Sequence, residues 1–187
     1  MNRDEPPVIQ LEHGPSAETP DWSREAKAFW RWDPPRSLLA SLRAYERARA
    51  ESRPGRTLWR GLAVLRHRFW SALTGAEIPL GTRIEGGLLM PHPNGIVIHC
   101  DARIGPNCLI LQQVTLGVGG ALPGAPTLAG HCDLGAGAKL LGGVTIGAHA
   151  VVGANAVVLC DVPAGATAVG VPARVLPTRR STKAMDG

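Results

Sequence analysis

The sequence is poor in Phe and Tyr, in paired cysteines and in long apolar runs. Only two Phe and one Tyr occur among 187 residues, although 44% of the residues are apolar, so the core has to be built mainly from small aliphatic side chains. The four cysteines are 8, 24 and 28 residues apart and form no CxxC pair, which argues against zinc ligation and a disulfide framework. Buried, reduced thiols are expected at Cys100, Cys108, Cys132 and Cys160.

Segments that direct a protein to a membrane are also lacking. No run of about 18 apolar residues occurs, and the N-terminal stretch MNRDEPPVIQ has no apolar centre of the kind found in signal peptides. We therefore expect a cytoplasmic, reducing location and no membrane span, while association with a membrane surface stays open.

The formal charge of +5 is unevenly distributed. Much of it lies in Arg-rich segments before Gly75 and in RRSTK (179–183), whereas the rest of the chain is nearly uncharged. This distribution favours solvated basic faces and no nucleic-acid partner, with attraction of a small anionic ligand as the alternative.

Two helices are predicted before Gly75. PPRSLLASLRAYERARAES begins with prolines suited to a helix start, and RTLWRGLAVLRHRFWSALTG ends at Gly75, which is suited to cap a helix. The dipeptide PG at 54–55 separates them. Each helix is expected to pack through an apolar face, the first through Leu38, Leu39, Leu42 and Tyr45, the second through Leu58, Leu62, Leu65, Phe69 and Leu73. The polar, proline-broken residues 1–20 are expected to be flexible, so the helical lobe spans 21–75.

Glycine is abundant, at 23 residues, and beyond Gly75 it belongs to a six-residue repeat. One aliphatic residue recurs in each repeat, often followed directly by Gly, and a small residue lies four places further on. The aliphatic positions are Ile78, Ile84, Met90, Ile98, Ile104, Ile110, Leu116, Leu128, Leu134, Leu140, Ile146, Val152, Val158 and Ala164. The small positions are Cys108, Val114, Cys132, Ala138, Val144, Ala150 and Ala156.

This period indicates short strands joined by tight turns, with three strands closing one coil of a parallel β-helix. Stacked coils bury the aliphatic ladder and satisfy the backbone groups of each coil against its neighbours. The fold class is therefore mainly β, with a β-helix over 76–176, a short N-terminal helical lobe and a tail at 177–187.

Two interruptions of the repeat are candidate functional segments, because repeat proteins place function where loops leave the coil. In MPHPNGIVIH, His92 occupies a turn position between Pro91 and Pro93, so its ring should point outward, as a general base requires. In LGVGGALPGAPT, glycines at 117, 119 and 120 permit close backbone approach to an extended ligand.

From about Arg66 to Val175, the chain resembles serine O-acetyltransferases, which are hexapeptide-repeat acyltransferases. The stretches that carry the resemblance are LTGAEIP, HPNGIVIH, DARIGPNCLILQQVTLG, LGAGAKLLGGVTIGAHAVVGANAVVL and DVPAGATAVGVPARV. The resemblance implies a left-handed β-helix, a homotrimer, acetyl-CoA as co-substrate with no metal, and direct acetyl transfer to a hydroxyl.

The resemblance also implies roles for individual residues. His92 falls on the catalytic histidine, and Glu77 on the carboxylate that partners it, which is usually Asp. Gly119, Ala136 and Ala154 fall on positions whose backbone lines the CoA groove. Two cations are further candidates for the CoA phosphates: Lys139 and Arg174.

Three departures from the family pattern leave the acceptor open. Pro91 replaces an Asp, and Gly124 and Ala125 replace an Arg-His pair, so the contacts that hold the charges of serine are absent. An acetyltransferase of saccharide or exopolysaccharide pathways is the alternative, and a non-catalytic assembly module is the alternative of another class. The helical lobe is shorter than usual, and the C-terminus lacks the Ile that docks into a sulfhydrylase. His131 either replaces the missing loop histidine or is simply exposed in a turn, and His99 and His149 are also read as surface histidines.

Overall fold

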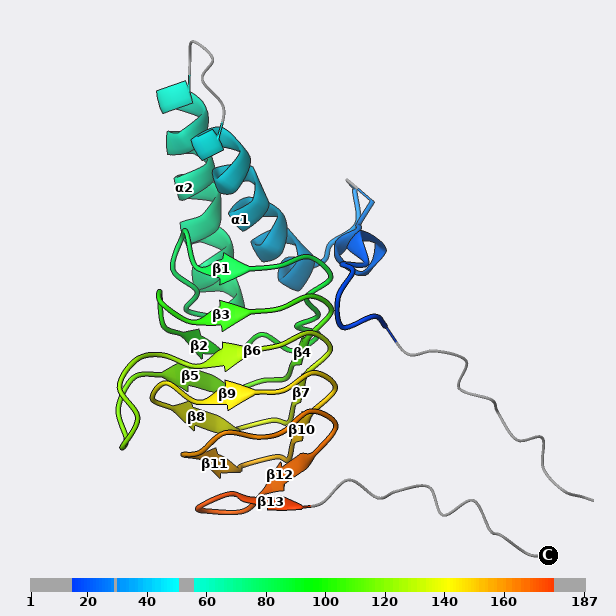
Figure 1. Ribbon diagram of the computed structural model, residues 1–187. Coiled ribbons are helices and arrows are strands. Elements are labelled where there is room, and N and C mark those ends of the chain that lie inside the picture. The colour runs from blue at the N-terminus through cyan, green and yellow to red at the C-terminus, as the bar shows by residue number, and fades with distance from the viewer. Residues whose placement is uncertain (1–14, 29, 51–55, 177–187) are drawn as a thin grey trace, which may run out of the picture.

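A computed structural model describes residues 15–28, 30–50 and 56–176. Two helices stand at one end of a column of short strands (Figure 1). A short 3₁₀ helix, η1 (Trp22–Glu25), precedes α1 (Pro34–Ala50) and α2 (Arg56–Thr74). The predicted prolines begin α1, and Gly75 ends α2 with φ +67° and an N–H bond to the Ser71 carbonyl at 2.9 Å. The PG break lies outside the described residues.

The column consists of two- and three-residue strands in three sheets. The first sheet contains β1 (Arg83–Ile84), β3 (Arg103–Ile104), β6 (Thr127–Leu128) and β9 (Thr145–Ile146). The second contains β4 (Leu109–Ile110), β7 (Asp133–Leu134), β10 (Val151–Val152), β12 (Thr167–Val169) and β13 (Arg174–Leu176). The third contains β2 (Val97–Ile98), β5 (Thr115–Gly117), β8 (Lys139–Leu141) and β11 (Val157–Val158).

Successive strands from β1 to β12 belong to different sheets, so three strands complete one coil and the next coil stacks below it (Figure 1). All pairings are parallel except that of β12 with β13, which closes the C-terminal end. The three-sided parallel β-helix predicted from the period is confirmed.

The aliphatic ladder fills the interior as predicted. Ile110, Leu116 and Leu140 are fully buried, and the small position of each repeat is buried beside them. The prediction is wrong at Ala164, which is exposed, because the last interval shortens and Val162 pairs with Ile146 in its place. Val162 is 2% exposed.

Helix α2 packs through a different face from the one its apolar pattern indicated. The small or polar residues Ala63, His67 and Thr74 are buried, whereas the predicted face of Leu and Phe side chains is 48–76% exposed. The buried residues lie on the opposite side of the helix from this stripe, which is defined by Leu58, Leu62, Leu65, Phe69 and Leu73. In α1, Leu38, Leu39 and Leu42 are buried as expected.

The expectation of buried thiols holds for two of the four cysteines. Cys108 and Cys132 point into the column, whereas Cys100 and Cys160 are exposed. The exposed pair follows strands at corner positions rather than at the inward position of a repeat. All four are free thiols.

The chain before α1 crosses one corner of the column. Asn107, fully buried, donates to the carbonyls of Ser16 at 2.7 Å and Thr19 at 2.8 Å, and accepts the N–H of Asp21 at 2.8 Å. The side chain of Glu25 binds Arg43 of α1 at 2.9 Å. Residues 1–14 of the segment expected to be flexible, and the tail at 177–187, lie outside the described residues.

Candidate functional site

His92 lies in the turn that enters one corner of the column. In this corner, which we name the His92 corner, Gly95, Gln113, Gly137 and Asn155 stack on successive coils. Their N–H groups bond to the coil before, as in Gln113 to the Asn94 carbonyl at 2.9 Å and Asn155 to the Ala136 carbonyl at 2.8 Å. These turns fix the backbone on which His92 is held.

The side chain of His92 is exposed, although Met90, two residues earlier, is buried in the aliphatic ladder. Pro91 and Pro93 restrict the backbone on both sides, and Gly95 has φ +71°, which a glycine adopts without strain. The two extra residues between Met90 and Ile98 thus form a rigid outward turn. Within the described residues, no hydrogen bond engages the His92 ring.

Glu77 lies on the neighbouring sheet surface. It forms a parallel bridge with Val97, receives the Ile98 N–H at 2.9 Å and donates its own N–H to the Ile96 carbonyl at 2.7 Å. Its side chain is exposed, and no hydrogen bond or ion pair between the described residues joins it to His92. The strand pairing aligns an outward column of residues: Glu77, Val97, Thr115, Lys139 and Val157.

Several predicted cofactor residues lie near the His92 corner. Ala136 and Ala154 are in its turns on successive coils, and Lys139 donates from Nζ to the Gln113 carbonyl of the same corner. Gly119 lies at the far end of the same sheet, in the segment between β5 and β6. Arg174 is exposed on β13, at the C-terminal end of the column.

The segment between β5 and β6 projects from the column (Figure 1). Its base is fixed because Gly142 donates to the Gly117 carbonyl at 2.9 Å and Gly143 to the Leu122 carbonyl at 3.0 Å. A Cβ at Gly142 would lie 2.5 Å from the Gly119 carbonyl oxygen. The loop therefore passes closely over the next coil, while Val118 beside it is 53% exposed.

A cavity of about 660 Å³ lies between α2 and Glu77. His67, on its α2 wall, contacts Ser41 Oγ of α1 through Nδ1 at 3.3 Å. Burial lowers the pKa of His67, which favours the neutral ring. Sequence reasoning missed this residue, although its helical spacing from Ala63 and Thr74 places it on the face opposite the apolar stripe.

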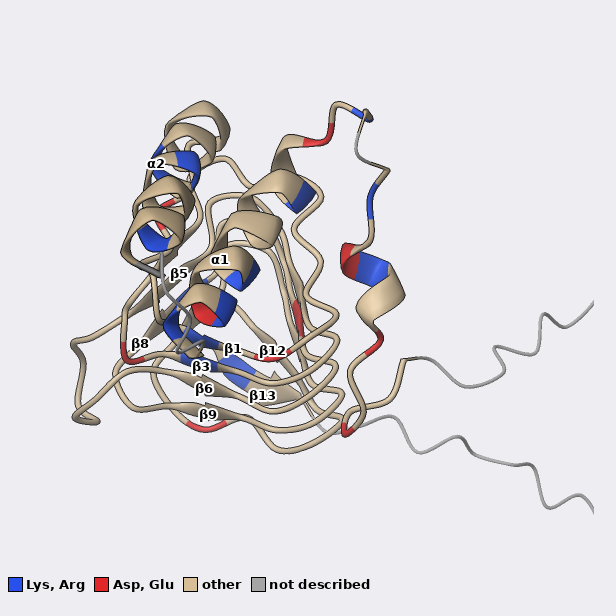
Figure 2. Ribbon diagram, turned by 90° about the horizontal axis from the view of Figure 1, so that it is seen from above, with Lys and Arg blue, Asp and Glu red and all other residues tan. Residues whose placement is uncertain are grey.

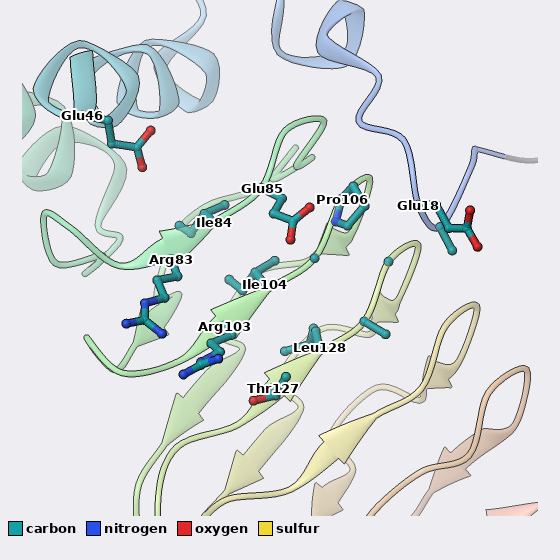
Figure 3. Close-up of a pocket in the computed structure, with 14 residues that line it drawn as sticks. Glu18, Glu46, Arg83, Ile84, Glu85, Arg103, Ile104, Pro106, Thr127 and Leu128 are labelled. Carbon is teal, nitrogen blue, oxygen red and sulfur yellow. The ribbon is translucent and has the colours of Figure 1, made fainter. Parts of the chain in front are cut away.

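Two other hollows lie beside α1. One, of about 350 Å³, is lined by Pro91 and by Leu39 of α1. The other, of about 650 Å³, lies on the sheet of β1, β3 and β6, where Arg83 and Arg103 occur side by side (Figure 3). None of the predicted site residues lines this second groove.

The other histidines of the column lie on different corners from His92. His131 stacks with His149 at the corner that also contains Asn107, and His99 lies in the turn between β2 and β3. Within one chain, therefore, His131 does not face the same surface as His92.

A three-sided parallel β-helix built on six-residue repeats, with an outward histidine at an interrupted coil, defines the hexapeptide-repeat class of acyltransferases. No family model matches the chain. A soybean serine acetyltransferase structure is 35% identical, with a TM-score of 0.57; the match covers 77% of this chain and 70% of the soybean chain. The chain belongs to the serine acetyltransferase family.

Other relatives support the same family. A serine acetyltransferase structure from Vibrio cholerae O1 biovar El Tor N16961 is 32% identical over 80% of this chain and 57% of its own, with a TM-score of 0.66. The serine acetyltransferase of Synechococcus elongatus is 48% identical over 59 residues, which are 30% of this chain and 24% of that protein. The chain thus spans about a quarter of that protein and just over half of the Vibrio chain.

Structures of serine acetyltransferases are left-handed parallel β-helices, and this chain shares that fold. The hand opposes the usual preference for right-handed crossovers. One of these neighbours, with a TM-score of 0.64, was solved in complex with CoA, and the soybean enzyme was also solved with serine.

Proposed function

We propose that this protein is an acetyl-CoA-dependent O-acetyltransferase in which His92 is the general base. The observation that carries the proposal is the exposed His92 side chain, held on a stiffened turn in a chain of the serine acetyltransferase family. A family neighbour binds CoA, which supports acetyl-CoA as the donor. None of the helices in the described ranges could cross a bilayer. The cytoplasmic location stays a proposal.

The reaction proceeds in one transfer step. The acceptor hydroxyl loses its proton to a neutral His92 nitrogen as its oxygen attacks the thioester carbonyl carbon. The C–S bond then breaks, the acetyl group stays on the acceptor oxygen, and the imidazolium returns its proton to the CoA sulfur, which leaves as the free thiol. A base positioned in this way accelerates the reaction roughly 10²–10⁴-fold. Glu77, which makes no hydrogen bond or ion pair to His92 among the described residues, is proposed to orient the ring in the complex with substrates and to stabilise its protonated form.

CoA is proposed to lie along the sheet of β2, β5 and β8. The backbone at Gly119, Ala136 and Ala154 lines its path, and Lys139 and Arg174 bind its phosphates. Support comes from the shared location of Ala136, Ala154 and Lys139 beside the His92 corner.

The acceptor is a serine-like or saccharide hydroxyl. Serine binding in the soybean relative favours the first. A saccharide is favoured by Pro91, Gly124 and Ala125, which offer no charged side chains for an ammonium and a carboxylate. Each unpaired charge would weaken serine binding by about 1–3 kcal/mol.

The active unit is proposed to be a homotrimer. Figures 1 and 2 both place α2 on the side of the column that carries β5 and β8. The α2 stripe is exposed, and so are Val118 and Leu122 in the loop that follows β5. Neighbouring copies packed against these residues would bury apolar area and add a second wall beside His92.

Acetyl transfer is tested by incubating purified protein with acetyl-CoA and with serine, homoserine, monosaccharides or oligosaccharides, while free CoA thiol is measured. We expect acceptor-dependent thiol release that falls at least 100-fold in His92→Ala. His99→Ala, which changes an imidazole on another corner, is the matched control and should retain activity. No release with any acceptor, together with no binding of CoA, would contradict the proposal and favour a non-catalytic assembly module.

A further inference from the structure

The imidazoles of His131 and His149 meet on the corner of the column away from His92. Their Nδ1 atoms are 2.7 Å apart, and the ring planes are inclined by 76° with centroids 4.9 Å apart. His131 is half-buried and His149 is exposed, so solvent reaches the pair. We propose that this pair is a binding site for a divalent transition-metal cation such as Ni²⁺ or Cu²⁺.

The backbone holds the two rings in place. Both residues adopt left-handed conformations, with φ +54° at His131 and +60° at His149. Their N–H groups bond to the preceding coils, at 2.7 Å to the Pro106 carbonyl and 3.1 Å to the Gly130 carbonyl. The backbone of both residues is thus fixed, with the two nitrogens close together, before a ligand arrives, which reduces the entropy lost on binding.

Two bare lone pairs would repel at 2.7 Å, so one ring donates its Nδ1–H to the other. No hydrogen bond among the described residues engages either Nε2. The bridging proton therefore moves to Nε2 of its own ring when a cation enters, and both rings stay neutral. Rotation of the two side chains then turns each Nδ1 lone pair from the other nitrogen toward the metal, which keeps its remaining positions for water.

The separation of the nitrogens needs the smaller adjustment for a metal that holds neighbouring ligands at a right angle. With metal–nitrogen bonds of about 2.1 Å, two neighbouring ligands at a right angle lie roughly 3.0 Å apart, whereas tetrahedral ligands lie about 3.4 Å apart. The observed 2.7 Å is closer to the first value. Octahedral or tetragonal Ni²⁺ and Cu²⁺ are therefore favoured over tetrahedral Zn²⁺.

A second group of donor atoms provides the internal comparison. His99, Cys100 and Asp101 have donor atoms within 4.8 Å of one another. The Nδ1 of His99, however, already accepts the Asp101 N–H at 3.2 Å, so its lone pair is engaged.

The test is calorimetric titration of tag-free protein with Ni²⁺, before and after His131→Asn or His149→Asn. Asparagine tolerates the left-handed backbone, so circular dichroism and the unfolding temperature should change little. We expect one equivalent of Ni²⁺ to bind and each variant to weaken binding at least tenfold, while His99→Asn has no effect. Electron paramagnetic resonance of bound Cu²⁺ should show two nitrogen ligands that become one in either variant.

Two results would overturn the site. One is the absence of Ni²⁺ and Cu²⁺ binding to the parent protein at millimolar metal. The other is binding that both corner variants retain, or that His99→Asn abolishes. None of these measurements depends on acetyl transfer, so the metal site and the proposed reaction are tested independently.

Discussion

At the scale of single residues, Asn107 illustrates how one side chain fixes a chain segment. It adopts φ +60° at the same corner as His131, and its carboxamide is fully buried beneath residues 16–21. Each of its three side-chain hydrogen bonds joins the backbone of that segment to the column. Asn107 therefore combines the turn conformation with attachment of the N-terminal segment.

Asn107→Ala should destabilise the fold, since it removes the partner of two part-buried carbonyls and one part-buried N–H. Because water can reach these groups in part, the loss should be about 1–3 kcal/mol in all. For a domain of this size, this lowers Tm by roughly 2–12 °C in thermal unfolding. Asn155→Ala is the matched control because Asn155 has φ +55° but is exposed. A comparable loss in both variants would show that only the turn conformation matters.

The left-handed turn positions could be predicted only as a class. The six-residue period indicates where each turn falls, and glycine or asparagine is suited to such positions. Nothing in the spacing indicates that Asn107 meets the chain 91 residues earlier, or that His131 meets His149. Those contacts depend on which turns lie above one another in the column. The two interruptions of the period change which residues are aligned in this way.

At the scale of elements, α2 has two faces with different partners. Its small buried face packs on α1, and Arg60 lies over the Tyr45 ring with its guanidinium carbon 5.8 Å from the ring centroid. The opposite stripe is exposed in the single chain. The bounds of both helices could be predicted from the prolines, from Gly75 and from the helical period. The packing face of α2 could not, because the prediction assumed that its bulky apolar residues pack within the chain.

Leu62→Glu with Phe69→Glu should dissociate the proposed trimer into monomers without unfolding the chain. Charges on a buried apolar interface are costly, whereas on the exposed face of a monomer they are tolerated. Light scattering coupled to size-exclusion chromatography measures the mass, and thiol release should fall in parallel. Arg103→Glu, on the sheet of β3, is the control and should leave the mass unchanged. A parent protein that is already monomeric and active would disprove the arrangement.

At the scale of the whole molecule, His67 lies where the two helices meet the column. Its pKa is lowered by burial, so the folded state binds a proton less readily than the unfolded chain, whose histidines titrate near about pH 6.5. Stability from the neutral ring is complete above that pH. As pH falls below it, the unfolded chain takes up the proton first and stability is lost.

Thermal unfolding should accordingly shift to lower temperature as pH is reduced from about 7.5 to 5.5. His67→Gln keeps a polar group for Ser41 but does not titrate, so its Tm should depend less on pH in this interval. His99→Gln, at a half-exposed turn, should behave as the parent protein does. An unchanged pH slope in His67→Gln would assign the effect to other groups.

The column as a whole was the most predictable part of the molecule. Inward residues such as Ile104 and Leu134 follow from a strict period, because an interior ladder admits only small aliphatic side chains. The prediction is wrong at Ala164, because a shortened interval places Val162 in the inward position instead. The outward placement of His92 agrees with its turn position, but the catalytic roles assigned to His92 and Glu77 stay predictions.

Every parallel strand of the column bonds only to the coils directly above and below it. Leu128 and Ile146, paired on adjacent coils, are eighteen residues apart in the chain. Duplicating or deleting such an eighteen-residue unit in the C-terminal coils would lengthen or shorten the column by one coil and leave the His92 turn unchanged. The architecture thus allows evolution to change the molecule's height and its chemistry independently.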